Sequence, residues 1–100
     1  LHGEAVATGM LMAADLSCRS GWISREDVQR IGRLLEKAGL PVEPPAELDI
    51  ERYLQLMKVD KKVMDGRIRL VLLRAIGSAF VSDSYDTDLL RQTLASRKLI

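Results

Sequence analysis

Cysteine and histidine each occur only once among these 100 residues, as Cys18 and His2. A single cysteine cannot form an internal disulfide, so a reducing cytoplasm is the simplest compartment to expect. No apolar run approaches the roughly 20 residues that cross a bilayer. The amino-terminal residues also lack the basic-then-apolar order of a secretory signal. We therefore expect a cytoplasmic chain that does not bind membranes.

Neither sign of charge is in excess, because 15 basic and 14 acidic residues alternate along the chain and give a net charge of +1. This balance produces no field strong enough to predict binding to nucleic acid. The sequence also lacks a glycine-rich phosphate loop, a G-x-G-x-x-G motif after a strand and an H-E-x-x-H motif. The chain by itself therefore carries none of these dinucleotide, nucleotide or zinc-peptidase signatures.

The composition that remains is that of one globular domain, with 47% hydrophobic and 29% charged residues. One hundred residues are enough for a single core, so residues 1–100 are predicted to form one domain. The chain begins with Leu1 instead of methionine, and a residue as bulky as leucine usually prevents removal of an initiator methionine. We therefore expect that a segment upstream of Leu1 is missing.

The first predicted helix runs from Glu4 to Ser20, where apolar residues recur at three- and four-residue steps. Its apolar positions are Val6, Met10, Ala13, Ala14 and Leu16. Small residues between them allow another backbone to approach closely. We expect this helix to be buried at the centre of the domain.

Three further helices are predicted. Ser24 and Asp27 resemble a capping box and begin the second helix, which Gly39 ends. The apolar stripe of this helix comprises Val28, Ile31, Leu34, Leu35 and Ala38. The third helix extends from Asp49 to about Val59, and the last begins at Asp86 or Thr87 and ends near Lys98.

Between the last two predicted helices, the spacing of the apolar residues changes from a helical period to the alternation that is typical of a strand. Residues 68–73 predict a strand, and residues 79–82 predict its partner across a loop that contains Gly77. Arg67, Arg69 and Arg74 are expected on the exposed face of this hairpin. The predicted fold is therefore mainly α, with four helices and one small β-hairpin.

His2 lies with Gly3 and Glu4 at the start of the first helix, where backbone amides and the helix dipole favour anions. A catalytic zinc usually takes three protein ligands. This chain offers one imidazole, one thiol and scattered acids, so it is not expected to complete such a site. Sequence chemistry alone also permits His2 to be a solvated residue near a chain end.

Lys61 and Lys62 follow Asp60 in the break between the third helix and the first strand. From such a loop an ammonium group can meet a carboxylate or a phosphate. Two adjacent lysines are also commonly just solvated surface charge. Both interpretations remain open at this stage.

Four segments in fixed order resemble the C-terminal third of 3-dehydroquinate synthases. They are residues 1–10 (LHGEAVATGM), 38–41 (AGLP), 60–63 (DKKV) and 69–73 (RLVLL) followed by Ile76-Gly77. The resemblance runs over nearly the whole chain, and the first and third segments together are specific. It implies the C-terminal metal and substrate domain of that fold, without the N-terminal NAD-binding domain.

The resemblance implies an enzyme of the lyase class in the shikimate pathway, which leads to chorismate and the aromatic amino acids. Such enzymes convert 3-deoxy-D-arabino-heptulosonate 7-phosphate to 3-dehydroquinate and phosphate, with bound NAD and a divalent metal, zinc or cobalt. It further implies that His2 is the last of three metal ligands and that Lys61 or Lys62 contacts the substrate's anionic groups. The intact enzyme is compatible with a homodimer.

Because the other ligands and the NAD-binding domain belong upstream, we expect the chain alone to be inactive and to bind a metal weakly at most. Two alternatives remain open. One is a domain of another sugar-phosphate cyclase or of a metal-dependent polyol dehydrogenase, which share the two-domain plan. The other is a non-enzymatic helical module that binds a protein partner through an exposed apolar face.

Overall fold

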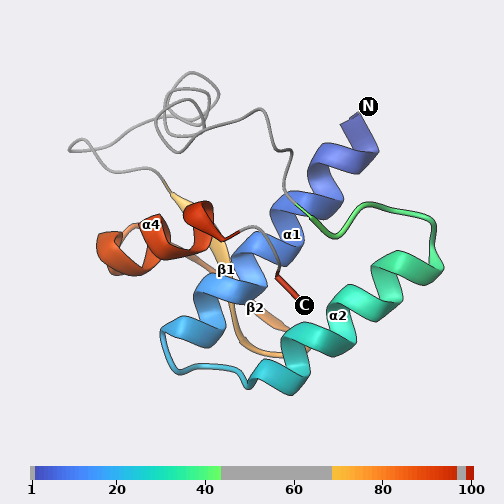
Figure 1. Ribbon diagram of the computed structural model, residues 1–100. Helices are drawn as coiled ribbons and strands as arrows, with labels where there is room; N and C mark the ends of the chain where they lie inside the picture. Colours follow the sequence, from blue (N-terminus) through green and yellow to red (C-terminus); the bar gives the residue numbers. More distant parts are fainter. Residues whose placement is uncertain (1, 44–68, 97–98) are drawn as a thin grey trace.

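The computed structural model describes residues 2–43, 69–96 and 99–100, apart from the side chains of His2 and Ala5 (Figure 1). Its elements are α1 (His2–Arg19), α2 (Arg25–Lys37), β1 (Leu70–Ala75), β2 (Ser78–Ser82) and α4 (Thr87–Ala95). A mainly helical fold with one two-stranded antiparallel sheet was predicted and is confirmed. The described residues contain three helices and not the predicted four, because the helix predicted from Asp49 to about Val59 lies outside them.

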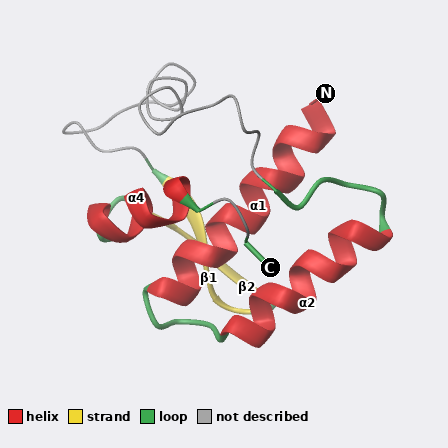
Figure 2. Ribbon diagram, viewed as in Figure 1, coloured by secondary structure: helices red, strands yellow, loops and turns green. Residues whose placement is uncertain are grey.

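Helix α1 lies at the centre of the described elements. It contacts α2, β1 and α4, and Figure 2 shows it crossing the molecule between α2 and the layer formed by the hairpin and α4. Leu11, Ala14 and Leu16 of α1 are at most 1% exposed and form the middle of the core. The predicted central, buried helix is therefore confirmed for its carboxyl-terminal two-thirds.

The amino-terminal part of α1 differs from the prediction. Val6 and Met10 were expected on the buried face, yet they are 46% and 54% exposed. Ala7 and Leu11, one position further along, are buried. The apolar residues of this part therefore lie on two sides of the helix, and only one side meets the core of the described chain.

Helix α2 begins with the predicted capping box. The Ser24 hydroxyl oxygen accepts from the amide of Asp27 at 3.1 Å, and the Asp27 carboxylate accepts from the amide of Ser24 at 3.2 Å. Val28 is fully buried, whereas Leu34, which was predicted on the same stripe, is 69% exposed. After the helix, Gly39 has a φ of 78°, a left-handed conformation that glycine adopts without strain.

The hairpin covers one side of α1. Its strands pair antiparallel with Leu72 opposite Phe80, and Gly77 in the turn has a φ of 87°. The strands are Leu70–Ala75 and Ser78–Ser82, where 68–73 and 79–82 were predicted. The side chain of Leu72 is fully buried in the core.

Two of the three arginines predicted on the exposed face of the hairpin, Arg69 and Arg74, are exposed, and Arg67 lies outside the described residues. The guanidinium carbon of Arg74 lies 4.3 Å from the centre of the Phe80 ring. Trp22 packs edge-on against the same ring at 5.2 Å. This small surface cluster joins the loop after α1 to the hairpin.

Helix α4 completes the core of the described residues by packing against α1. Asp86 caps it, because its carboxylate accepts hydrogen bonds from the amides of Asp88 and Leu89 at 2.8 and 3.3 Å. Leu90 and Leu94 of this helix are buried. None of the helices in the described ranges combines the length and the apolar character needed to cross a membrane.

Candidate functional site

His2 is the first residue of α1, a helix that was predicted to begin at Glu4. Figure 1 shows this end of α1 projecting away from α4 and from the hairpin. Gly3 and Glu4 beside it are exposed. The amino-terminal turn is therefore accessible, and the role of His2 as a metal ligand stays a prediction.

Lys61 and Lys62 lie outside the described residues. The structure therefore neither brings them to His2 nor separates them from it. Within residues 2–43, 69–96 and 99–100, no group of three or more His, Cys, Asp or Glu side chains is arranged to hold a metal ion. The predicted substrate cation stays a prediction as well.

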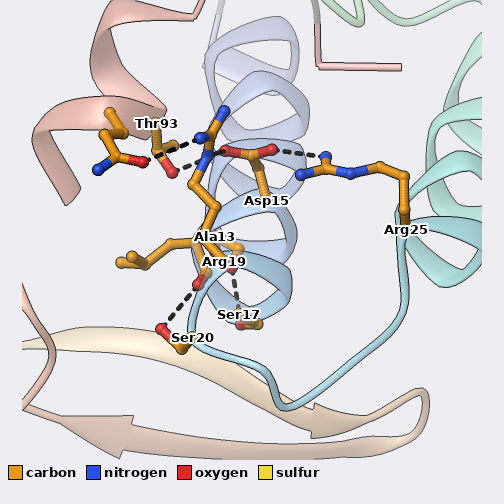
Figure 3. Close-up of polar contacts among 9 residues, drawn as sticks. Ala13, Asp15, Ser17, Arg19, Ser20, Arg25 and Thr93 are labelled. Carbon is orange, nitrogen blue, oxygen red and sulfur yellow. Dashed lines mark hydrogen bonds and ion pairs between the residues drawn. The ribbon is translucent and has the colours of Figure 1, made fainter. Parts of the chain in front are cut away.

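The described residues do contain a buried charged cluster that the sequence analysis missed. Its centre is Asp15 of α1, which is 1% exposed. Arg25 donates to its Oδ1 at 2.6 Å, while Arg19 and Thr93 donate to its Oδ2 at 2.7 Å each. Figure 3 shows these three side chains converging on the carboxylate from α1, α2 and α4. Arg19 also donates to the side-chain oxygen of Gln92 at 3.2 Å.

Two opposing effects act on the Asp15 carboxyl. Burial raises its pKa, because a low-dielectric interior disfavours the charged form. Hydrogen bonds from Arg19, Arg25 and Thr93 lower the pKa and together outweigh burial, so the pKa lies below its ordinary value. The hydrogen bond to Asp15 raises the pKa of Arg25. Asp15 is therefore held as an anion and is unsuited to donate a proton near neutral pH.

The cluster acts as an anchor between elements. Its three donors come from α1 itself, from the first residue of α2 and from α4, so one carboxylate joins all the described helices. Each of its oxygens accepts from a charged donor, the stronger class of hydrogen bond. The arrangement fixes the carboxyl-terminal half of α1, and both oxygens of the carboxylate accept hydrogen bonds from these donors (Figure 3).

A second buried polar contact ties the hairpin to α1. The amide of Leu73 in β1 donates to Oγ of Ser17 at 2.9 Å, and the Ser17 hydroxyl donates to the carbonyl of Ala13 at 2.7 Å. Ser17 is fully buried. One hydroxyl thus satisfies a strand amide that faces the helix.

One sequence signal could have located the cluster in part. Asp15 stands between Ala14 and Leu16 in a helix predicted to be buried, and Arg19 follows at the four-residue spacing of helical ion pairs. A buried acid needs such a partner. Arg25 and Thr93 gave no comparable signal, because they lie 10 and 78 residues away in the chain.

The chain is similar in sequence to known proteins over most of its length. Residues 1–63 match the family described as 3-dehydroquinate synthase C-terminal. Similar proteins include the 3-dehydroquinate synthases of Nitrosococcus oceani (58% identical over 94 residues), Methylococcus capsulatus (57% over 94) and Pseudomonas syringae pv. tomato (52% over 96). The alignments cover 94%, 94% and 96% of this chain but 26% of each relative. The chain thus spans about a quarter of the length of the relatives it matches.

Proposed function

Because this chain belongs to the 3-dehydroquinate synthase C-terminal family, we propose that it forms one wall of the active site of a 3-dehydroquinate synthase. The observation that carries the proposal is the family match over residues 1–63, a range that contains His2, Lys61 and Lys62. The relatives named above are synthases by name, which favours this function over another cyclase, a polyol dehydrogenase or a non-enzymatic module. Residues 1–100 then form the C-terminal metal and substrate domain, and an NAD-binding domain precedes it.

The proposed reaction forms 3-dehydroquinate and phosphate from 3-deoxy-D-arabino-heptulosonate 7-phosphate and depends on NAD and a divalent metal. The described residues alone do not fit a complete metal site, since no three candidate ligands meet among them. His2 is proposed as one ligand, and the family resemblance assigns the others to residues upstream of this chain. NAD is likewise assigned to the upstream part, because this sequence lacks a dinucleotide-binding loop.

The geometry of α1 supports the role of His2. The helix is held at its carboxyl-terminal half by Asp15 and Ser17, while Gly3 and Glu4 of its first turn are exposed. The backbone of the first turn therefore belongs to a helix that is anchored to the rest of the described domain. A metal ligand needs a supported backbone of this kind, because its position must be held closely for coordination.

One of the two lysines is proposed to bind the substrate. The heptulosonate phosphate carries a carboxylate and a phosphate, both of which an ammonium group attracts. A cation at a fixed position holds such a polyanion in register for reaction, which lowers the entropic part of the barrier. The proposed role is electrostatic, so its loss should affect substrate binding more than metal binding.

The test uses the full-length enzyme that contains this chain. We expect His2→Ala to remove bound metal and abolish turnover, as measured by metal analysis and by dehydroquinate formation. Either Lys61→Ala or Lys62→Ala should raise KM while metal content stays normal, and Lys37→Ala, at an exposed position on α2, is the matched control. Normal metal content and rate after His2→Ala would refute the metal assignment. Failure of the wild-type enzyme to make dehydroquinate would refute the proposed reaction.

A further inference from the structure

The two edges of the hairpin differ in what they contact. Strand β1 contacts α1 as well as β2, and the amide of Leu73 in β1 donates to Ser17 of that helix. Strand β2 contacts β1 and no other helix or strand of the described chain. The edge of β1 is therefore supported by α1, whereas the edge of β2 is open within the described residues.

The bond between Leu73 and Ser17 shows which backbone groups lie on the open edge. In an antiparallel pair, opposite residues that exchange backbone hydrogen bonds alternate with opposite residues whose amides and carbonyls point away from each other. Because the Leu73 amide points to Ser17, the pair of Leu73 and Ala79 is of the second kind. The alternation assigns Val71 and Val81 to the same kind. The N–H and C=O groups of Ala79 and Val81 therefore point outwards along the edge of β2.

This edge also lacks charge and proline, two common means by which natural proteins prevent an open edge from pairing. Strand β2 consists of Ser78, Ala79, Phe80, Val81 and Ser82. Val81 is 64% exposed, and Ala79 is exposed as well. Exposed backbone donors and acceptors on an uncharged edge are the features that favour the addition of another strand.

The sequence of β2 is complementary to itself in an antiparallel arrangement. Ala79 and Val81 lie symmetrically about Phe80, so a two-fold axis at Phe80 places Ala79 of one copy opposite Val81 of the other. Each such pair exchanges two backbone hydrogen bonds, which gives about four in all. No like charges meet, and a small side chain lies opposite a larger one on the same face. A two-fold interface uses the same patch on both copies, which is the commonest symmetry among oligomers.

We propose that β2 pairs antiparallel with β2 of a second copy of this chain, with Phe80 at the two-fold axis. The two hairpins then form one four-stranded sheet in the order β1-β2-β2-β1. The pairing satisfies the outward N–H and C=O groups of Ala79 and Val81 and covers part of the exposed Val81 side chain. It involves none of the residues assigned to the metal or the substrate, so it does not depend on the proposed reaction.

Disulfide trapping in the full-length enzyme tests this register. Ala79→Cys and Val81→Cys are co-expressed, the enzyme is oxidised mildly, and peptide mass spectrometry identifies the linked positions. Opposite residues that exchange hydrogen bonds have Cα atoms about 5.5 Å apart, within the span of about 4.4–6.8 Å that a disulfide bridges. Either variant alone places its two thiols on a diagonal, about 7–8 Å apart. We therefore expect at least about tenfold more cross-linked dimer from the co-expressed pair than from either variant alone.

Val71→Cys is the matched control. Val71 is 60% exposed, close to the value for Val81, and lies opposite Val81 on the same face of the hairpin. In the proposed sheet it is two strands, about 9–10 Å, from Ala79 of the partner subunit. Co-expression of Val71→Cys with Ala79→Cys should therefore give no more cross-link than the single variants. Equal cross-linking by Val71→Cys and Val81→Cys would indicate random collision and overturn the proposal.

Hydrogen exchange at the amides of Ala79 and Val81 in the wild-type full-length enzyme distinguishes the other possible occupants of the edge. Slow exchange together with the specific cross-link supports pairing with a second copy. Slow exchange without the cross-link assigns the cover to another segment of the enzyme, and fast exchange leaves the edge in water. Either of the last two results overturns the proposal.

Discussion

The hydroxyl of Thr93 donates a 2.7 Å hydrogen bond to Oδ2 of Asp15, a residue that precedes it by 78 positions in the chain. Both side chains are 1% exposed. The bond therefore joins α4 to α1 inside the core, where water cannot replace it. It is the most distant contact in sequence among those made by the Asp15 carboxylate.

Thr93→Val tests this bond while it preserves the shape of the side chain. A buried hydrogen bond to a charged acceptor typically contributes about 1.5–3 kcal/mol. Since Asp15 keeps both arginines in the variant, we expect the free energy of unfolding to fall by about 1–2 kcal/mol, as measured by urea denaturation. Thr87→Val, at the exposed first residue of α4, is the control. Equal effects of the two substitutions would contradict the role of Thr93.

Asp15→Asn should destabilise the chain in a pH-dependent way. Near neutral pH the variant leaves Arg19 and Arg25 without their anion, but these side chains are 28% and 44% exposed and can regain water. We therefore expect a loss of about 2–3 kcal/mol, below the 3–5 typical of a fully buried pair. Urea denaturation at pH 7 measures the loss.

The sign of the pH effect follows from the lowered pKa of Asp15. A carboxyl whose folded pKa lies below its ordinary value of 3.8 binds protons more readily when unfolded. The stabilisation that ionised Asp15 gives to the folded state is therefore complete above its ordinary pKa, and it is lost as the pH falls through the folded pKa. The difference in unfolding free energy between wild type and Asp15→Asn should therefore shrink below pH 4. A difference that stays constant down to pH 2 would contradict this account.

Local signals in the sequence predicted the starts of α2 and α4 well, whereas α4 ends at Ala95 and not near Lys98. Ser24 and Asp27 cap α2, and Asp86 caps α4, because each cap needs only groups within three residues of one another. The strand boundaries were less accurate. An irregularity in pairing between Leu73 and Ala75 extends β1 beyond the alternating pattern on which the prediction depended.

Periodicity could not decide which apolar side of a helix meets the core. Val6, Met10 and Leu34 fit a helical stripe, yet they are exposed, because burial depends on which elements pack nearby. The same limit hid the Asp15 cluster, whose partners come from three helices. The metal and substrate residues came from family resemblance and remain predictions, since composition and spacing alone do not distinguish them from surface residues.

Ser17→Ala should loosen the hairpin. The substitution leaves the amide of Leu73 without its acceptor in a buried position, which typically costs about 1–3 kcal/mol. Ser20 is a matched control, because its hydroxyl also donates to a carbonyl four residues earlier. We expect hydrogen exchange at the Leu73 amide to accelerate in Ser17→Ala and to stay unchanged in Ser20→Ala. Unchanged exchange in both variants would show that another group satisfies the amide.

The effect of Gly32→Ala on the free energy of unfolding should depend on the residue at position 100. We expect a decrease when that residue is isoleucine and an increase when it is alanine. A Cβ atom on Gly32 would lie 2.5 Å from Cγ2 and 2.8 Å from Cδ1 of Ile100, so the isoleucine must move. Alanine in a helix interior gains about 1 kcal/mol over glycine. Overpacking of a well-filled site costs about 1–3 kcal/mol, so we expect a small net loss of stability in the wild-type background.

Ile100→Ala removes the atoms that the new methyl group would meet. In that background only the helix propensity remains, and Gly32→Ala should stabilise the chain by about 0.5–1 kcal/mol. Urea denaturation of the four proteins in this double-mutant cycle measures both effects. Because propensity acts equally in both backgrounds, the coupling energy reports the packing of Ile100 against α2. A coupling energy near zero would mean that Ile100 does not occupy this site in solution.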